Sequence, residues 1–208
     1  MNQRRKPYVR ASEEQRHQAL ILATQRCVAL GGVQRATVRN IAAEAGVTPG
    51  LIRHYFPGKA ELLCATYQFT MTEMTAVSVQ ATQRKDCSAI ERLHHFVRAT
   101  LSAPVMSAER HQLWASFTSL IRTMPELAKV HRESYLEFRQ ACSTLVAEVL
   151  AERGLKASPL RVEQLAIAIN AVLDGLWLEG CLATELFGEQ EIAEIGVRSV
   201  DDLLGLST

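Results

Sequence analysis

The sequence predicts an all-α protein, and three observations favour that class. No glycine occurs between Gly58 and Gly154 and only two prolines do, whereas strands and hairpins need frequent turns. Apolar residues recur at helical spacing in successive segments, and a serine or threonine stands where several of these segments begin. Hydrophobic residues make up 48% of the chain and charged residues 22%, which is typical of a folded protein with a buried core.

Three helices are predicted in the N-terminal part. Each begins at a capping side chain, namely Ser12 in an S-x-x-Q capping box, Thr37 and Thr48. Glycines should end the first two, at Gly31-Gly32 and at Gly46. The third has Pro49 in its first position, where a missing N–H costs nothing, and should run to Tyr55-Phe56.

Longer helices are predicted in the remainder. The first of them should begin near Lys59 and end around residues 84–87. The others are expected at residues 88–103, 107–123, 125–153, 160–186 and 189–204. We therefore expect two domains, a smaller one over residues 1–58 that includes a basic arm at residues 1–11, and a larger helical one over residues 59–208.

Charge is distributed unevenly, although the net charge is only +1. Residues 1–59 carry ten Lys/Arg and three Asp/Glu, whereas residues 60–208 carry thirteen and nineteen. A basic segment of this kind suits a polyanionic partner, and the acidic remainder does not.

Patterns for membrane insertion, metal binding and catalysis are weak. The longest apolar stretch, residues 165–178, is shorter than a bilayer span and is interrupted by Asn170 and Asp174. Five scattered cysteines without a C-x-x-C pair favour a reducing cytoplasm. The E-x-x-H segment at residues 91–94 has no second copy, so a di-iron site is not indicated. We expect a cytoplasmic protein with no catalytic site, metal, cofactor or membrane contact.

Residues 37–56 have the layout of a helix-turn-helix, in which the second helix enters the DNA major groove. The outward positions predicted to contact DNA on that helix are Thr48, Pro49, Gly50, Arg53 and His54. Arg53 is the candidate for reading guanine, because its guanidinium matches O6 and N7 together. Thr37, Tyr55 and Lys59 are predicted to bind phosphates. The alternative is a packing motif that binds no DNA.

The run ATVRNIAAEAGVTPGLIRHYFPGKAELLCATY at residues 36–67 resembles the N-terminal DNA-binding domain of the TetR family of bacterial repressors. The glycine turn, the Tyr55-Phe56 pair and Lys59 carry the resemblance. It implies a three-helix DNA-binding domain, a larger helical domain for ligand binding and dimerisation, and release of a palindromic operator when a small molecule binds.

Three segments of the remainder resemble the choline-responsive repressors of glycine-betaine synthesis. They are Trp114-Ala115-Ser116-Phe117, the break at Met124-Pro125-Glu126-Leu127, and LDGLWL at residues 173–178. Those repressors commonly have a tryptophan and an arginine at two positions where this chain has Thr118 and Glu179.

The segment 160–186 is apolar around most of its circumference, so it must be covered on more than one side. Ala168, Ala171 and Gly175 form a strip of small residues that would let another helix approach closely. We expect a homodimer through residues 160–204, built as a four-helix interface. The alternative is burial of this segment within a monomer.

Asn170, Asp174 and Trp177 share one stripe of that helix, which predicts a pocket for a small-molecule effector. The candidate ligand-binding residues are Trp114, Phe117, Tyr135, Asp174, Trp177 and Glu179. Aromatic rings and a carboxylate favour an organic cation. The resemblance of LDGLWL to the choline-responsive repressors implies choline or a related amine, and Glu179 in place of the arginine would also favour a polyamine. One alternative is an apolar or anionic effector. Another is that Asn170 and Asp174 bond across the dimer while Trp177 is core.

The function that these patterns favour is a ligand-responsive transcriptional repressor that binds double-stranded DNA. The alternative is a helical small-molecule carrier or interaction module without specific DNA binding, whose retention of DNA would be weak and salt-dependent.

Overall fold

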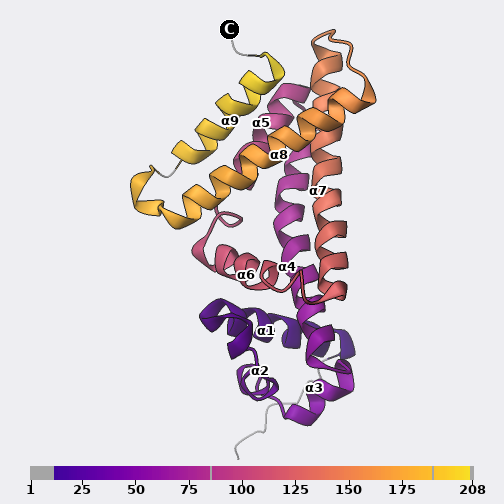
Figure 1. Cartoon of the computed structure of the whole chain (residues 1–208), viewed down its shortest axis with the longest axis vertical. Helices are drawn as coiled ribbons and strands as arrows, with labels where there is room; N and C mark the ends of the chain where they lie inside the picture. The colour runs from indigo at the N-terminus through magenta and orange to yellow at the C-terminus, as the bar shows by residue number, and fades with distance from the viewer. Residues whose placement is uncertain (1–11, 85, 189, 207–208) are drawn as a thin grey trace, which may run out of the picture. The chain divides into compact units, whose positions relative to one another are not determined.

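The computed structural model describes residues 12–84, 86–188 and 190–206, so the basic arm with Arg4, Arg5, Lys6 and Arg10 lies outside the described residues. Every regular element within those ranges is helical (Figure 1), which confirms the predicted all-α class. The chain divides into two compact units, Met1–Thr66 and Tyr67–Thr208, and the boundary falls within helix α4 (Lys59–Thr82).

The first unit contains α1 (Glu13–Arg35), α2 (Val38–Glu44) and α3 (Pro49–Tyr55). The capping box forms at the start of α1, where Ser12 Oγ accepts from Gln15 N–H at 3.2 Å and Gln15 Oε1 accepts from Ser12 N–H at 2.8 Å. The backbone leaves helical geometry at Gly31-Gly32, as predicted, but one further turn follows before the chain reaches Ala36.

A small core holds the first three helices together. Its buried members include Leu20 and Val28 of α1, Ile41 of α2, and Ile52 of α3, followed by Phe56. The Phe56 ring stacks on His17 with 4.5 Å between ring centroids. Because α3 buries only Ile52, most of its remaining surface is available to another molecule.

The second unit contains the rest of α4 and the helices α5 (Ala89–Thr100), α6 (Ala108–Thr118), α7 (Pro125–Glu152), α8 (Pro159–Leu182) and α9 (Glu191–Leu204), with a 3₁₀ turn at Thr184–Leu186. Helices α5, α6 and α8 end at least three residues earlier than predicted. Helix α5 stops at Thr100, α6 gives way to turns at residue 119, and α8 stops at Leu182 because Ala183 adopts a non-helical backbone.

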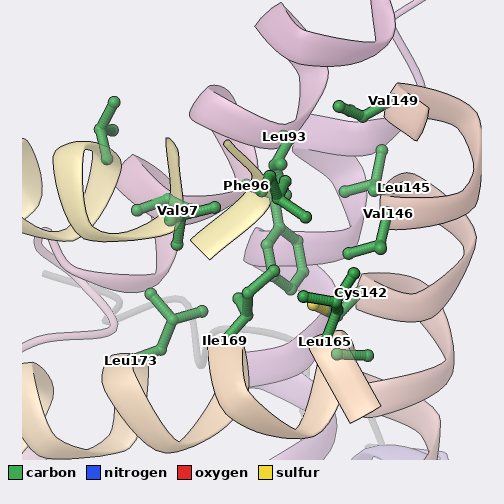
Figure 2. Packing of buried hydrophobic residues seen from close by; sticks show 14 of the residues in the cluster. Leu93, Phe96, Val97, Cys142, Leu145, Val146, Val149, Leu165, Ile169 and Leu173 are labelled. Atoms are coloured by element: carbon green, nitrogen blue, oxygen red, sulfur yellow. The ribbon is translucent and has the colours of Figure 1, made fainter. Parts of the chain in front are cut away.

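The core of this unit lies between α5, α7, α8 and α9. Figure 2 shows Phe96 of α5 among Cys142 of α7 and Leu165 and Ile169 of α8, all of them buried. Gly196 of α9 allows a close approach to α5, because a Cβ at that position would lie 2.4 Å from Leu101 Cδ1.

The E-x-x-H segment takes part in helix capping and packing. Glu91 Oε2 accepts from the Ser88 N–H at 2.8 Å and completes a capping box at the start of α5. His94 Nε2 lies 2.7 Å from Asp201 Oδ1, which connects α5 to α9. An Arg98–Glu194 ion pair at 2.7 Å joins the same two helices.

Helix α8 is long and apolar enough, by length and composition alone, to span a membrane. One side of it is buried in the core, through residues such as Leu165, Ile169 and Leu173. The other side exposes apolar side chains, with Leu160 at 64%, Ile167 at 44%, Leu178 at 38% and Leu182 at 63% of their surface accessible. We call these four residues the α8 apolar face.

Candidate functional site

Helices α2 and α3 present the predicted DNA-contacting residues to solvent. Gly46, with φ of +65°, forms the turn between the two helices, a backbone conformation that favours glycine. Thr37, Thr48, Pro49, Gly50, Arg53, His54 and Lys59 are exposed, and Tyr55 is half-buried. Arg53 forms no ion pair with any described residue, so its guanidinium is available to another molecule.

Two of the three predicted phosphate ligands, Thr37 and Lys59, have local partners that leave donors free. Thr37 Oγ1 accepts from the Asn40 N–H at 3.1 Å, so its own O–H can still donate. Lys59 Nζ donates to the Val33 carbonyl oxygen at 3.1 Å and keeps two further N–H groups. Thr48 stands at the start of α3 but its side chain forms no capping bond there, contrary to expectation.

A cavity of about 300 Å³ lies within the second unit and is lined by side chains from α4, α5, α6, α7 and α8. Four of the predicted effector-binding residues line it, namely Trp114, Tyr135, Asp174 and Trp177. Phe117 and Glu179 do not. Phe117 is fully buried with its ring centroid 4.9 Å from that of Tyr67, and Glu179 is exposed on α8 outside the lining.

Asp174 is the carboxylate of the cavity, and it belongs to a hydrogen-bonded triad. Tyr135 O–H donates to Asp174 Oδ2 at 2.8 Å. Asn170 Nδ2 donates to the same oxygen at 2.9 Å and also to the Tyr135 hydroxyl oxygen. Both donors converge on Oδ2, so the described residues leave Oδ1 of Asp174 open to a ligand.

Among the described residues, no full positive charge balances the Asp174 carboxylate of the triad. Desolvation raises the pKa of Asp174 above its ordinary value of 3.8, against the hydrogen bonds from Tyr135 and Asn170, which lower it. Burial, with the neighbouring Asp174, raises the pKa of Tyr135 to about 12, so the phenol stays a neutral donor at neutral pH. His131 stacks on Tyr135, but burial lowers its pKa, so a full imidazolium charge is disfavoured at neutral pH. No Lys or Arg among the described residues pairs with Asp174.

Aromatic rings form a large part of the remaining lining. Trp114 and Trp177 meet edge to face with ring centroids 5.6 Å apart. Trp177 Nε1 donates to the Val105 carbonyl oxygen at 3.2 Å, which fixes the orientation of the indole. An apolar, aromatic cavity that contains one unbalanced carboxylate is suited to an organic cation.

Part of the lining could not be selected from the sequence. Helix α4 contributes Met71, Met74, Thr75 and Ser78, and α7 contributes Phe138. The methionines and Phe138 follow the ordinary apolar spacing of amphipathic helices, which does not distinguish a cavity wall from a core. In the first unit, Arg39 of α2 is also exposed, although the sequence did not mark it as a DNA-contacting residue.

Both units contain segments that match known protein families. Residues 20–66 match the family described as bacterial regulatory proteins of the tetR family, and residues 89–205 match the family described as BetI-type transcriptional repressor, C-terminal. The HTH-type transcriptional regulator BetI of Burkholderia mallei is 29% identical over 192 residues, which cover 92% of this chain and 94% of the relative.

Two solved structures have the same fold. A transcriptional regulator from Pseudomonas aeruginosa PAO1 is 32% identical, with a TM-score of 0.85 over 94% of this chain and 93% of that chain. A regulator from Saccharomonospora viridis in complex with choline is 16% identical, with a TM-score of 0.74 over 93% of this chain and 97% of that chain. The chain therefore belongs to the BetI-type transcriptional repressors of the TetR family, and it is a DNA-binding transcriptional regulator.

Proposed function

We propose that this regulator acts in the cytoplasm as a homodimer. It releases a palindromic operator when a small organic cation enters the cavity lined by α4, α5, α6, α7 and α8. The observation that carries the proposal is Asp174, a carboxylate without a paired cation in an aromatic cavity. A cation would supply the missing charge, and the structural relative from Saccharomonospora viridis is bound to choline.

The cavity supports a monovalent cation of about the size of choline. Each ring of Trp114, Tyr135 or Trp177 that faces the cation contributes about 0.5–2 kcal/mol. Micromolar affinity requires about 8 kcal/mol, which two or three rings, apolar contact and the Asp174 carboxylate can supply together. A polyamine has less support, because Glu179, the second carboxylate it would need, lies outside the lining.

The DNA-binding part of the proposal rests on α3. Arg53 would read guanine, with Thr48, Pro49, Gly50 and His54 around it, and Thr37, Tyr55 and Lys59 would bind the phosphates. One short helix reads too few base pairs for tight discrimination, so two copies about one DNA turn apart, about 34–36 Å, are required.

The dimer would form through residues 160–204, with the α8 apolar face at its centre. The small residues Ala171 and Gly175 are exposed on the same helix, and no described atom lies within 4 Å of a Cβ built on Gly175. A partner helix can therefore approach closely there, and covering the apolar face explains why a DNA-binding protein exposes it.

Calorimetric titration tests the effector. Choline should bind the wild-type protein, spermidine should bind less tightly, and a fatty acid should not bind. Asp174→Asn and Trp177→Ala should each lose choline affinity at least tenfold, because one removes the charge and the other a cage ring. Glu179→Gln is the matched control, since it neutralises a carboxylate of the same helix outside the cavity, and it should bind as the wild type does. Binding of the fatty acid alone, or choline affinity unchanged in Asp174→Asn, would show that the site is wrong.

A further inference from the structure

A groove of about 510 Å³ lies between α7 and the beginning of α8, and we call it the α7–α8 groove. Its α7 wall carries Leu136 and Arg139, its α8 wall carries Pro159 and Glu163, and the remaining lining residues are Gln140, Ser143 and Ala166. Leu136 is a large apolar side chain, yet it is 45% exposed. Arg139 is half-buried, yet its guanidinium forms no ion pair with any described residue. The groove therefore offers a partner one apolar contact and one unpaired cation.

The 3₁₀ turn Thr184–Leu186, which follows α8, carries groups that complement the groove. Leu186 is 70% exposed, more than any other large apolar side chain among the described residues. Glu185, next to it, is exposed and forms no ion pair with any described residue. An exposed leucine beside an unpaired carboxylate matches the exposed leucine and the unpaired guanidinium of the α7–α8 groove.

The turn cannot reach the groove of its own protomer. The groove lies at the beginning of α8, whereas the turn follows the last residue of that helix (Figure 1). Helix α8 has 24 residues, so about 36 Å separate its two ends. A second copy of the chain is therefore needed to bring the two complementary surfaces together.

We propose that the turn Thr184–Leu186 of each protomer docks into the α7–α8 groove of the other protomer. This inference rests on the homodimer of the proposed function and adds α7 to its interface. A two-fold axis beside the midpoint between Ala171 and Gly175 makes the two α8 helices antiparallel there. Pro159 precedes that midpoint by 14 positions and Leu186 follows it by 13, so the end of one α8 meets the beginning of the other.

The docked turn places opposite charges together and covers apolar surface. Leu186 of the partner subunit packs on Leu136, and Glu185 of the partner subunit pairs with Arg139, whose planar guanidinium can bind both carboxylate oxygens. The Glu163 carboxylate on the α8 wall repels the incoming carboxylate and directs it towards α7. Symmetry gives the dimer two such contacts. They select a second copy of this chain over a related regulator that lacks the matching charges.

A charge-reversal cycle, measured by sedimentation equilibrium on the full chain, tests the contact. Arg139→Glu should raise the dimer dissociation constant about tenfold or more, because each groove then repels the partner's Glu185 from both walls. Adding Glu185→Arg to that variant should return the constant to within about threefold of the wild-type value, because opposite charges face each other again. Glu185→Arg alone completes the cycle. It should change the constant less than Arg139→Glu does, since Arg139 repels the new guanidinium while Glu163 attracts it.

Arg122→Glu is the matched control, because Arg122 is exposed in the turn before α7 and lies outside the groove lining. It should leave the dissociation constant unchanged. The difference between Arg139→Glu and the wild type should shrink in 1 M salt, where the Debye length is about 3 Å. An unchanged constant in Arg139→Glu would leave the groove to another occupant and overturn the proposal, as would a double variant that is not restored. A wild-type protein that is monomeric would instead overturn the proposed homodimer itself.

Discussion

Replacing Leu182 with glutamate should separate the two protomers without unfolding either. Leu182 is 63% exposed in the protomer, so this side chain still has well over half of its surface to bury. Complete burial of a leucine is worth about 1.5–3 kcal/mol, so covering the exposed part contributes about 1–2 kcal/mol in each protomer. Two-fold symmetry doubles the effect to about 2–4 kcal/mol, and the dimer dissociation constant should rise roughly 30-fold to 1,000-fold.

Sedimentation equilibrium over a range of protein concentrations measures this dissociation constant directly. Leu155→Glu is the matched control, because Leu155 is 50% exposed but lies in the loop between α7 and α8, outside the α8 apolar face. It should leave the dimer intact. Both variants should keep wild-type helical content by circular dichroism. An unchanged dissociation constant in Leu182→Glu, or an equal loss in both variants, would refute the placement of the interface on α8.

Four further changes probe the other parts of the protein. In gel shifts with DNA from upstream of its own coding region, Arg53→Ala should weaken specific binding by about 1–3 kcal/mol, whereas Lys59→Ala should weaken binding to all sequences and reduce the salt slope by about one. In thermal unfolding, Gly196→Ala should lower the free energy of unfolding by about 1–3 kcal/mol, because its Cβ would overlap the buried Leu101. Asp174→Asn should raise the melting temperature of the effector-free protein at neutral pH; a lower value would contradict the desolvation of this carboxylate.

The sign of the Asp174 effect follows from linkage. Its pKa is raised in the folded protein above 3.8, so the folded state binds this proton more tightly than the unfolded chain does. Ionisation therefore costs stability as pH rises from 3.8 through the folded-state pKa, and the cost is complete above that value. The advantage of Asp174→Asn should grow across this window and should be absent below it. A bound cation should remove the advantage at neutral pH.

Helix beginnings could be predicted from the sequence more closely than helix ends. Ser12 and Ser88 were expected to begin helices, and each forms a capping box with the Gln or Glu three residues later. The end of α5 carries no such signal. The chain leaves the helix at Leu101, a buried residue three positions before the nearest proline, and no local sequence pattern marks this position.

The candidate cavity could be predicted only in part, for a related reason. Asp174 and Trp177 share a stripe of α8, so helical periodicity brings them to one wall. Phe117 was expected among the effector-binding residues with Trp114, yet only Trp114 lines the cavity, and Phe117 packs on Tyr67. The contribution of α4 depends on how distant helices pack, and a single sequence without tertiary contacts does not contain that information.

Release of DNA by choline, measured by fluorescence anisotropy, tests the central claim most directly. The labelled DNA is the fragment upstream of this protein's own coding region, and the proteins are wild type, Asp174→Asn and Glu179→Gln. We predict that all three bind the DNA with similar affinity, and that choline releases the wild type and Glu179→Gln while Asp174→Asn stays bound. Release of Asp174→Asn at the same choline concentration, or no release of the wild type, would contradict a switch controlled by a cation at Asp174.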